Sequence, residues 1–185
     1  LEFRRVLFRS FWWPGDYNGA MLMRIDNDLT PKVIQCDIQG HNGLAFSPDK
    51  RWMFTSDTPN GVIYRTPLDE QGEPGKRAEF RRFSEGDGIP DGAAMDEEGC
   101  YWSALFDGWR IARFSPQGVQ LEEYRLPVRC PTMVCFGGDE MKTLFITTTR
   151  ENMEAEELAK YPLSGAIFTL PVNVAGMKKS RFIEH

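Results

Sequence analysis

The sequence has no uninterrupted apolar run of about 18 residues, which a membrane-spanning helix would require. It also has no basic excess, because 22 lysines and arginines stand against 27 aspartates and glutamates and leave a net charge of −5. A general nucleic-acid surface needs a basic stripe, so we expect neither a membrane nor a nucleic acid as partner. With only two histidines and no visible serine, histidine and aspartate constellation, the chain does not favour a serine-hydrolase mechanism.

Cysteine is scarce and is not arranged in Cys-x-x-Cys pairs. The four cysteines are Cys36, Cys100, Cys130 and Cys135. Disulfide frameworks and zinc–thiolate sites both depend on characteristic cysteine spacings. We therefore expect reduced, mostly buried thiols in a cytoplasmic protein.

Glycine, proline and aromatic residues are plentiful, as in chains of many short strands joined by tight turns. Three units repeat one order: a strand of small residues, a turn, an aromatic-rich strand, and a third strand. The units begin at Asn42, Asp91 and Thr132, a period of about 40 to 50 residues, which is typical of β-propeller blades of four strands. The alternative is an ordinary β-sandwich, but a sandwich does not require successive units of the same internal order.

The second unit shows the pattern most clearly, over residues 88–104. Pro90 fixes its own φ and Gly92 tolerates unusual backbone angles, so Asp91 is predicted at a sharp entry into a strand. An isolated Pro-Asp-Gly sequence is usually only a turn. The recurrence of the pattern in the other units favours a site.

The starting residues of the three units are candidates for a shared site. In a propeller the small-residue strand is the innermost one, so equivalent residues on different blades converge at the central channel. We therefore expect Asn42, Asp91 and Thr132 to be neighbours. An amide oxygen and a carboxylate there form part of a cation site for calcium, magnesium or manganese, with zinc possible through carboxylate and water ligands. The alternative is that Asn42 and Asp91 cap turns and bind backbone amides.

Several segments together resemble the regucalcin/gluconolactonase family, over about residues 19–176. They are residues 42–49 (NGLAFSPD), residues 89–92 (IPDG) with Asp96, Gly99 and Trp102, residues 136–138 (FGG), residues 144–147 (LFIT) and residues 156–168. The resemblance implies a six-bladed propeller and a divalent-metal-dependent hydrolase of sugar lactones.

The resemblance also implies ligands. The family binds its metal through a Glu, an Asn and an Asp, and Asn42 and Asp91 match the last two. The segments with the family's Glu and its substrate-binding Arg and Asn have no counterpart here. The chain is therefore expected to be a C-terminal fragment of about four blades, an incomplete propeller.

In this hypothesis the metal polarises the lactone carbonyl, and Asp91 serves as ligand or as general base for water. Asn42 is a neutral ligand that leaves the ion electrophilic. Weaker candidates for contact with the sugar lactone are Thr132, Thr148 and His41, each of which has a purely structural alternative. The rival function is a non-catalytic propeller that binds calcium or a protein partner.

Two further segments carry expectations. Residues 1–10 are basic, unlike the rest, and resemble translated vector sequence, so we expect a non-native leader there and a partial propeller domain over residues 11–185. Residues 151–160 have helical composition, with Asn152 as a possible cap. The acidic run in this segment, which includes Glu151, is interpreted as a solvated helix face.

Overall fold

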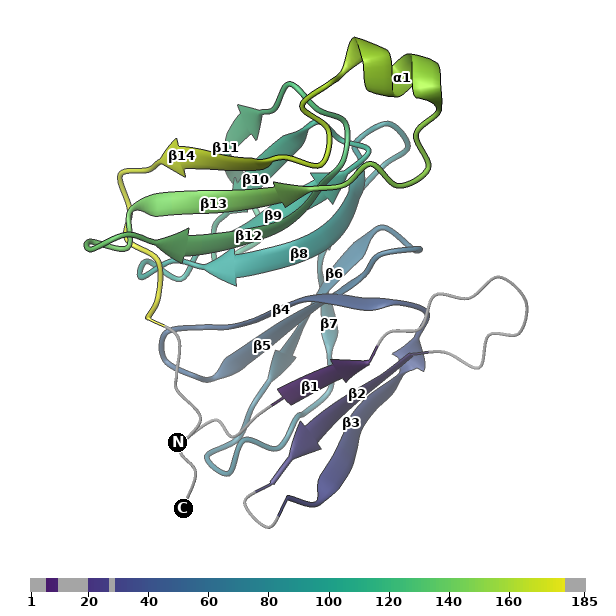
Figure 1. Ribbon diagram of the computed structural model, residues 1–185. Coiled ribbons are helices and arrows are strands. Elements are labelled where there is room, and N and C mark those ends of the chain that lie inside the picture. Colours follow the sequence, from purple (N-terminus) through teal and green to yellow (C-terminus); the bar gives the residue numbers. More distant parts are fainter. Residues whose placement is uncertain (1–5, 10–19, 27–28, 179–185) are drawn as a thin grey trace.

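The computed structural model describes residues 6–9, 20–26 and 29–178, and nearly all of its regular structure is antiparallel β-sheet (Figure 1). The first sheet contains β1 (Val6–Arg9), β2 (Ala20–Ile25) and β3 (Pro31–Ile38). The second contains β4 (His41–Phe46), β5 (Trp52–Asp57), β6 (Val62–Pro67) and β7 (Ala78–Arg82). The third contains β8 (Ile89–Met95), β9 (Tyr101–Phe106), β10 (Arg110–Phe114) and β11 (Gln120–Arg125). The fourth contains β12 (Pro131–Gly137), β13 (Thr143–Thr148) and β14 (Ile167–Pro171), with α1 (Ala155–Lys160) between the last two strands.

The four sheets are arranged as blades. Strands follow one another in chain order within every sheet, and the first strand of each sheet contacts the first strand of the next: β1 with β4, β4 with β8, and β8 with β12. A β-sandwich would pair two sheets face to face, whereas a propeller places successive first strands side by side around an axis. The prediction of an all-β, incomplete propeller of about four blades is confirmed.

Apolar side chains fill the spaces between neighbouring blades. Between the second and third sheets, Phe54 and Tyr101 are buried with ring centroids 5.4 Å apart. Between the third and fourth sheets, Trp102 is fully buried and meets Phe136 edge to face at 5.6 Å. Alternation along each strand puts one set of side chains into each interface, so the third blade is apolar on both faces.

An ion cluster around the buried pair Asp96 and Arg113 connects strands within the third blade. Asp96 is completely buried and accepts hydrogen bonds from Trp102 Nε1 and Arg113 Nε, both at 2.9 Å. The same Arg113 also pairs with Glu98 at 2.6 Å and Glu122 at 2.7 Å. A buried carboxylate needs such partners, because an unpaired charge in the interior is strongly destabilising.

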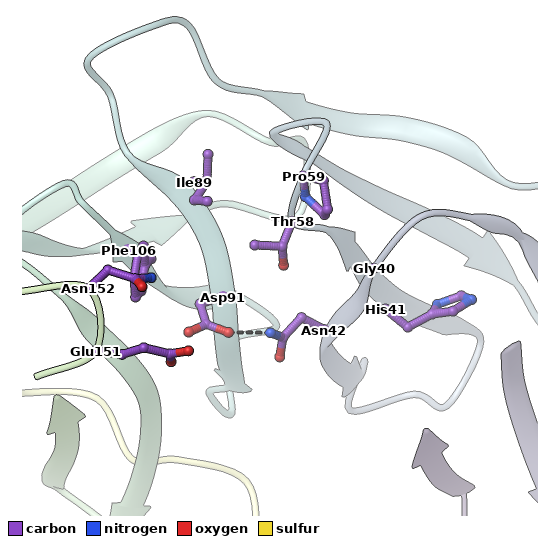
Figure 2. A pocket seen from close by; sticks show the side chains of 10 residues that line it. All are labelled: Gly40, His41, Asn42, Thr58, Pro59, Ile89, Asp91, Phe106, Glu151 and Asn152. Atoms are coloured by element: carbon purple, nitrogen blue, oxygen red, sulfur yellow. Dashed lines mark hydrogen bonds between the residues drawn. The ribbon is translucent and has the colours of Figure 1, made fainter. Parts of the chain in front are cut away.

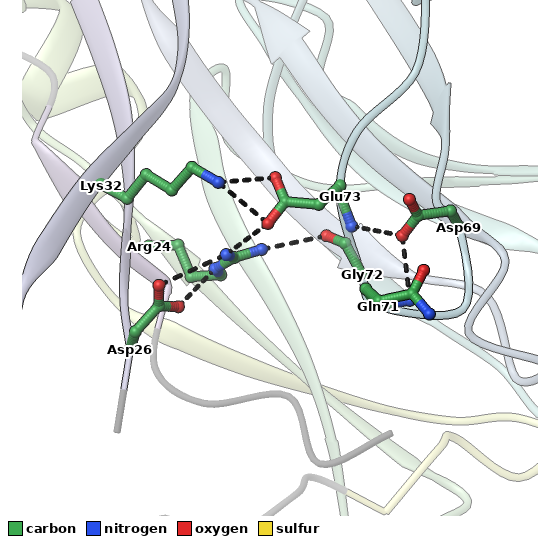
Figure 3. Close-up of polar contacts among 7 residues, drawn as sticks. All are labelled: Arg24, Asp26, Lys32, Asp69, Gln71, Gly72 and Glu73. Carbon is green, nitrogen blue, oxygen red and sulfur yellow. Dashed lines mark hydrogen bonds and ion pairs between the residues drawn. The ribbon is translucent and has the colours of Figure 1, made fainter. Parts of the chain in front are cut away.

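An ion-pair network connects the first blade to the second (Figure 3). Arg24 of β2 pairs with Glu73 at 2.7 Å, and Lys32 of β3 reaches the same carboxylate at 2.8 Å. Asp69 holds the loop by accepting from the Glu73 amide at 2.8 Å. The loop between β6 and β7 therefore reaches across to the neighbouring sheet.

The helix differs from the sequence prediction. Its N-cap is Glu154, whose side chain makes no capping hydrogen bond, and α1 begins only at Ala155. Asn152 has a φ of 57° and lies before the cap, so its predicted capping role is wrong. The described ranges contain no helix long and apolar enough to cross a membrane.

The expected non-native leader overlaps a strand. Within residues 1–10, Val6–Arg9 form β1, which pairs antiparallel with β2 in the register Val6 to Arg24. These four residues occupy the position of an innermost strand in the first sheet.

Candidate functional site

Irregular pairing marks the same place in three innermost strands. The register with the second strand of each sheet shifts just after Asn42 in β4, around Asp91 in β8, and around Thr132 in β12. A β-bulge takes a residue out of the regular ladder and redirects its side chain. The three starting residues predicted from the repeat are therefore structurally equivalent.

Two glycines let the innermost strands approach closely. Gly43 has a φ of +55°, and a Cβ there would collide with the hydroxyls of Ser56 and Tyr101 and lie 2.9 Å from the Asp91 carbonyl oxygen. A Cβ at Gly92 would lie 2.6 Å from the Thr132 carbonyl oxygen. Only glycine fits at such contacts, so these positions determine how near the residues of adjacent blades come.

Asn42 and Asp91 meet across the boundary between two blades (Figure 2). Asn42 Nδ2 donates a short hydrogen bond to Asp91 Oδ1, joining residues 49 positions apart. Asn42 Oδ1 accepts from the Gly43 amide at 3.1 Å, which fixes the plane of the side-chain amide. The prediction that these two side chains are neighbours is confirmed.

The pair lies in the wall of a pocket of about 390 Å³, within the size range of small-molecule sites. The pocket is lined by Gly40, His41, Asn42, Thr58, Pro59, Ile89, Asp91, Phe106, Glu151 and Asn152.

Asp91 is electrostatically unusual. Burial raises the pKa of its carboxyl group from 3.8 to about 7, and the nearby charge of Glu151 acts in the same direction. The hydrogen bond from Asn42 opposes that shift by stabilising the carboxylate. A carboxyl group with a pKa near neutrality can accept or release a proton at physiological pH.

Most of the chain matches the model of one protein family. The family model described as SMP-30/Gluconolactonase/LRE-like region matches residues 5–150. The chain belongs to this family. The resemblance inferred from its motifs is thereby confirmed.

Individual relatives differ from the chain in length. The chain is 53% identical over 174 residues to the 6-deoxy-6-sulfogluconolactonase of Pseudomonas putida. That alignment covers 94% of this chain and 60% of the relative. The chain is 30% identical over 141 residues to the L-arabinolactonase of Azospirillum brasilense, in an alignment that covers 76% of this chain and 46% of that relative. A crystal structure described as a calcium-binding protein, regucalcin, from Agrobacterium tumefaciens str. C58 superposes with a TM-score of 0.82 at 27% identity, over 90% of this chain and 56% of that one. The chain thus spans about half to three fifths of these relatives.

Asn42 and Asp91 carry the oxygen types that suit the divalent metal implied by the family, and the hydrogen bond between them turns Asn42 Nδ2, not Oδ1, toward the carboxylate. Together they offer a carboxylate and an amide oxygen, and hard divalent cations prefer oxygen ligands. The described pocket lining contains no lysine or arginine, so Asp91 is a half-buried carboxyl without a cationic neighbour in that wall. The residues that the structure describes include no group of three His, Cys, Asp or Glu placed to hold a metal ion. Asn42 and Asp91 therefore account for only part of a ligand set.

The two threonines predicted as weak candidates lie outside the pocket lining. Thr132 keeps its equivalent position in β12, but its hydroxyl is 2.8 Å from that of Thr147 in the neighbouring strand. Thr148 donates to the Ala166 carbonyl oxygen at 2.7 Å and accepts from the Gly165 amide at 3.0 Å. Both hydroxyls are engaged within the fourth blade, so the side chains that converge at the pocket are those of Asn42 and Asp91.

His41 is at the pocket but does not face the pair. Its side chain is buried and its ring points away from Asp91 (Figure 2). Burial lowers the pKa of His41 to about 4, so the imidazole is neutral at physiological pH. This geometry fits the structural alternative.

Glu151 is the functional candidate that sequence reasoning missed. Glu151 is exposed, as expected of a solvated residue, but its predicted place on a helix face is wrong, because α1 begins four residues later, at Ala155. Glu151 instead lines the pocket. Thr58 is a second such residue, and its hydroxyl donates to the Pro90 carbonyl oxygen at 2.7 Å, directly before Asp91. Both residues follow the ends of strands, which is where propellers and other β folds place their binding loops.

Proposed function

We propose that the protein is a lactonase that hydrolyses a sugar lactone with the help of a divalent cation. The observation that carries the proposal is the contact between Asn42 and Asp91, which come from separate blades and meet in a pocket of small-molecule size. Family membership and the names of the two lactonases described above support it.

Asn42 and Asp91 would hold the cation, which when bound supplies Lewis-acid polarisation of the ring carbonyl. Beside a cation the Asp91 carboxylate stays ionised and can accept a proton from the water that attacks the carbonyl carbon. Asn42 orients this carboxylate through its hydrogen bond and adds no negative charge. The carbonyl carbon gains the water oxygen, the ring C–O bond breaks, the ring oxygen takes up a proton, and the product is a hydroxy acid.

The remaining lining matches a sugar lactone in chemistry. Ile89, Phe106 and Pro59 provide apolar surface for the C–H face of a ring, while Thr58 and Asn152 carry hydrogen-bonding groups for hydroxyls. Lactones of six-carbon sugar acids are therefore the first substrates to test, including the sulfonated lactone for which the Pseudomonas relative is named.

The decisive experiment uses the full-length protein and the variant Asp91→Asn. Lactone hydrolysis is monitored by measuring the protons that it releases. Calcium, magnesium, manganese and zinc are tested separately, and a further assay contains a chelator. We expect kcat/KM to fall at least about 100-fold, because that is the usual contribution of a general base. Asp139→Asn, an exposed turn residue, is the matched control. A full rate in Asp91→Asn overturns the proposal.

A second candidate function is a propeller that binds calcium or a protein partner without catalysis, and the regucalcin structure described as calcium-binding favours it. In that case calcium would raise the melting temperature while no lactone of the panel is hydrolysed.

We also propose a cytoplasmic location, because all four cysteines are free, as in proteins of a reducing compartment.

A further inference from the structure

The wall opposite the Asn42–Asp91 pair comes from the fourth blade. Glu151 and Asn152, in the loop between β13 and α1, line the pocket there. Figure 2 shows the Glu151 carboxylate extending into the pocket toward Asp91. An exposed loop residue therefore places a negative charge beside the candidate reacting group.

This loop is fixed on both sides of Glu151. Before it, the Thr149 amide donates to the Cys130 carbonyl oxygen at 3.0 Å, and the Glu151 amide donates to Thr149 Oγ1 at 3.0 Å. After it, Arg129 Nη2 donates to the Asn152 carbonyl oxygen at 3.3 Å. These three hydrogen bonds fix the backbone on both sides of Glu151.

Arg129 connects this loop to two other elements. Its guanidinium pairs with Glu157 of α1 at 2.7 Å and with Asp107, in the turn between β9 and β10, at 3.0 Å. Next to these pairs, Trp109 and Tyr161 meet edge to face with ring centroids 4.8 Å apart. The helix and the loop before it are therefore fastened to the third blade, which also carries Asp91.

The described lining carries acidic side chains and, besides the neutral His41, no basic ones. It contains two carboxyl groups, Asp91 and Glu151, and no lysine or arginine. Sugar hydroxyls can donate hydrogen bonds to Glu151, whereas a sulfonate or carboxylate on that side is repelled. For unit charges about 7 Å apart at an effective dielectric constant of about 50, this repulsion corresponds to about fivefold in binding.

We propose that Glu151 is a specificity-determining residue that favours a neutral, hydroxyl-bearing substrate end on the α1 side of the pocket and disfavours an anionic one. Arg129 is the positioning residue that holds it there. The effect on catalysis rests on the proposed function, but the selection between neutral and anionic sugars in binding does not.

The test compares full-length wild type, Glu151→Gln and the matched control Glu154→Gln, an exposed glutamate of the same segment that does not line the pocket. Calorimetry measures the binding of D-glucose and of 6-deoxy-6-sulfo-D-glucose, and kcat/KM is measured for the two corresponding lactones. For each measurement we take the ratio of the value for the anionic compound to the value for the neutral one, using the association constants and the kcat/KM values. We expect Glu151→Gln to raise this anionic-to-neutral ratio about fivefold, with a smaller change at high salt. The control should leave the ratio unchanged.

An unchanged ratio in Glu151→Gln, an equal change in the control, or no binding of either sugar overturns the inference. A shifted binding ratio without hydrolysis of either lactone supports it while the lactonase proposal fails.

The positioning role of Arg129 has its own readout. Arg129→Gln should shift the ratio in the same direction as Glu151→Gln, and should produce no further shift in the double variant. A lower melting temperature with an unchanged ratio would show that Arg129 only stabilises the fold.

Discussion

Asn42 donates a hydrogen bond to the carboxylate of Asp91 across the boundary between the second and third blades. The contact exists because both strands bulge at these residues and because Gly43 presents no side chain to the neighbouring strand. The candidate site is thus a consequence of blade packing, and its energetics can be tested apart from any reaction.

Gly43→Ala should destabilise the protein strongly. Its Cβ would collide with the Ser56 and Tyr101 hydroxyls, in addition to the cost of about 1 kcal/mol or more for a left-handed backbone. Gly86→Ala is the matched control, because its φ is also positive, at +85°, yet nothing lies within 4 Å of the added Cβ. Urea unfolding should give a loss of about 3 kcal/mol or more for Gly43→Ala and about 1 kcal/mol for Gly86→Ala. Equal losses would contradict the close packing.

Asp96→Asn should cost about 3 to 5 kcal/mol, because it leaves the positive charge of the largely buried Arg113 with fewer partners. Glu98→Gln removes another partner of Arg113, but one that is 66% exposed, and should cost less than about 1 kcal/mol. Chemical denaturation at neutral pH measures both. A similar small loss in both variants would show that burial does not control the strength of this cluster.

Glu73→Gln should make stability less dependent on pH. Hydrogen bonds from Lys32 and then Arg24 lower the pKa of Glu73 below 4.5, so its contribution is present above that value and is lost as the pH falls below it. The Glu73 side chain is 39% exposed, so the effect at neutral pH should stay below about 1 kcal/mol and shrink with salt. Glu70→Gln, exposed in the same loop, is the control in urea titrations at neutral and acidic pH. Parallel pH curves for wild type and Glu73→Gln would refute the assignment.

Cysteine reactivity should follow burial. Burial, with a further contribution from Asp107, raises the pKa of Cys130 to about 12, so almost no thiolate forms at pH 8. Cys36 is exposed and should react quickly with a thiol reagent. Wild type should therefore show a fast phase that is absent in Cys36→Ser, while Cys130 reacts only on unfolding. Fast modification of Cys130 in the folded protein, located by mass spectrometry, would contradict this environment.

The blades and the Asn42–Asp91 pair could be predicted from the sequence because both depend on local patterns that recur. Each unit repeats its turn residues and its small-residue strand, and these features specify strand positions without knowledge of distant contacts. Equivalence among units then placed Asn42 and Asp91 together, which the structure confirms. The roles of the two residues as metal ligands, and of Asp91 as a base, stay predictions.

What the sequence did not give depends on contacts between distant segments. Glu151 lines the pocket from a loop in which Arg129 donates to the carbonyl oxygen of the next residue, and no local pattern encodes that bond. The same loop keeps Asn152 out of the capping position. The Thr132 hydroxyl meets Thr147 through strand register, and the direction of the His41 ring follows from packing. Side-chain direction at irregular positions is therefore the limit of pattern-based prediction here.

The central claim is that Asn42 and Asp91 act as one unit, and a double-mutant cycle on the full-length protein tests it most directly. Initial rates of lactone hydrolysis are measured for wild type, Asn42→Ala, Asp91→Asn and the double variant, with a saturating divalent cation. Groups that act together are strongly non-additive, so the double variant should lose about as much kcat/KM as the worse single variant. Losses that multiply, as for two independent sites, would contradict the account.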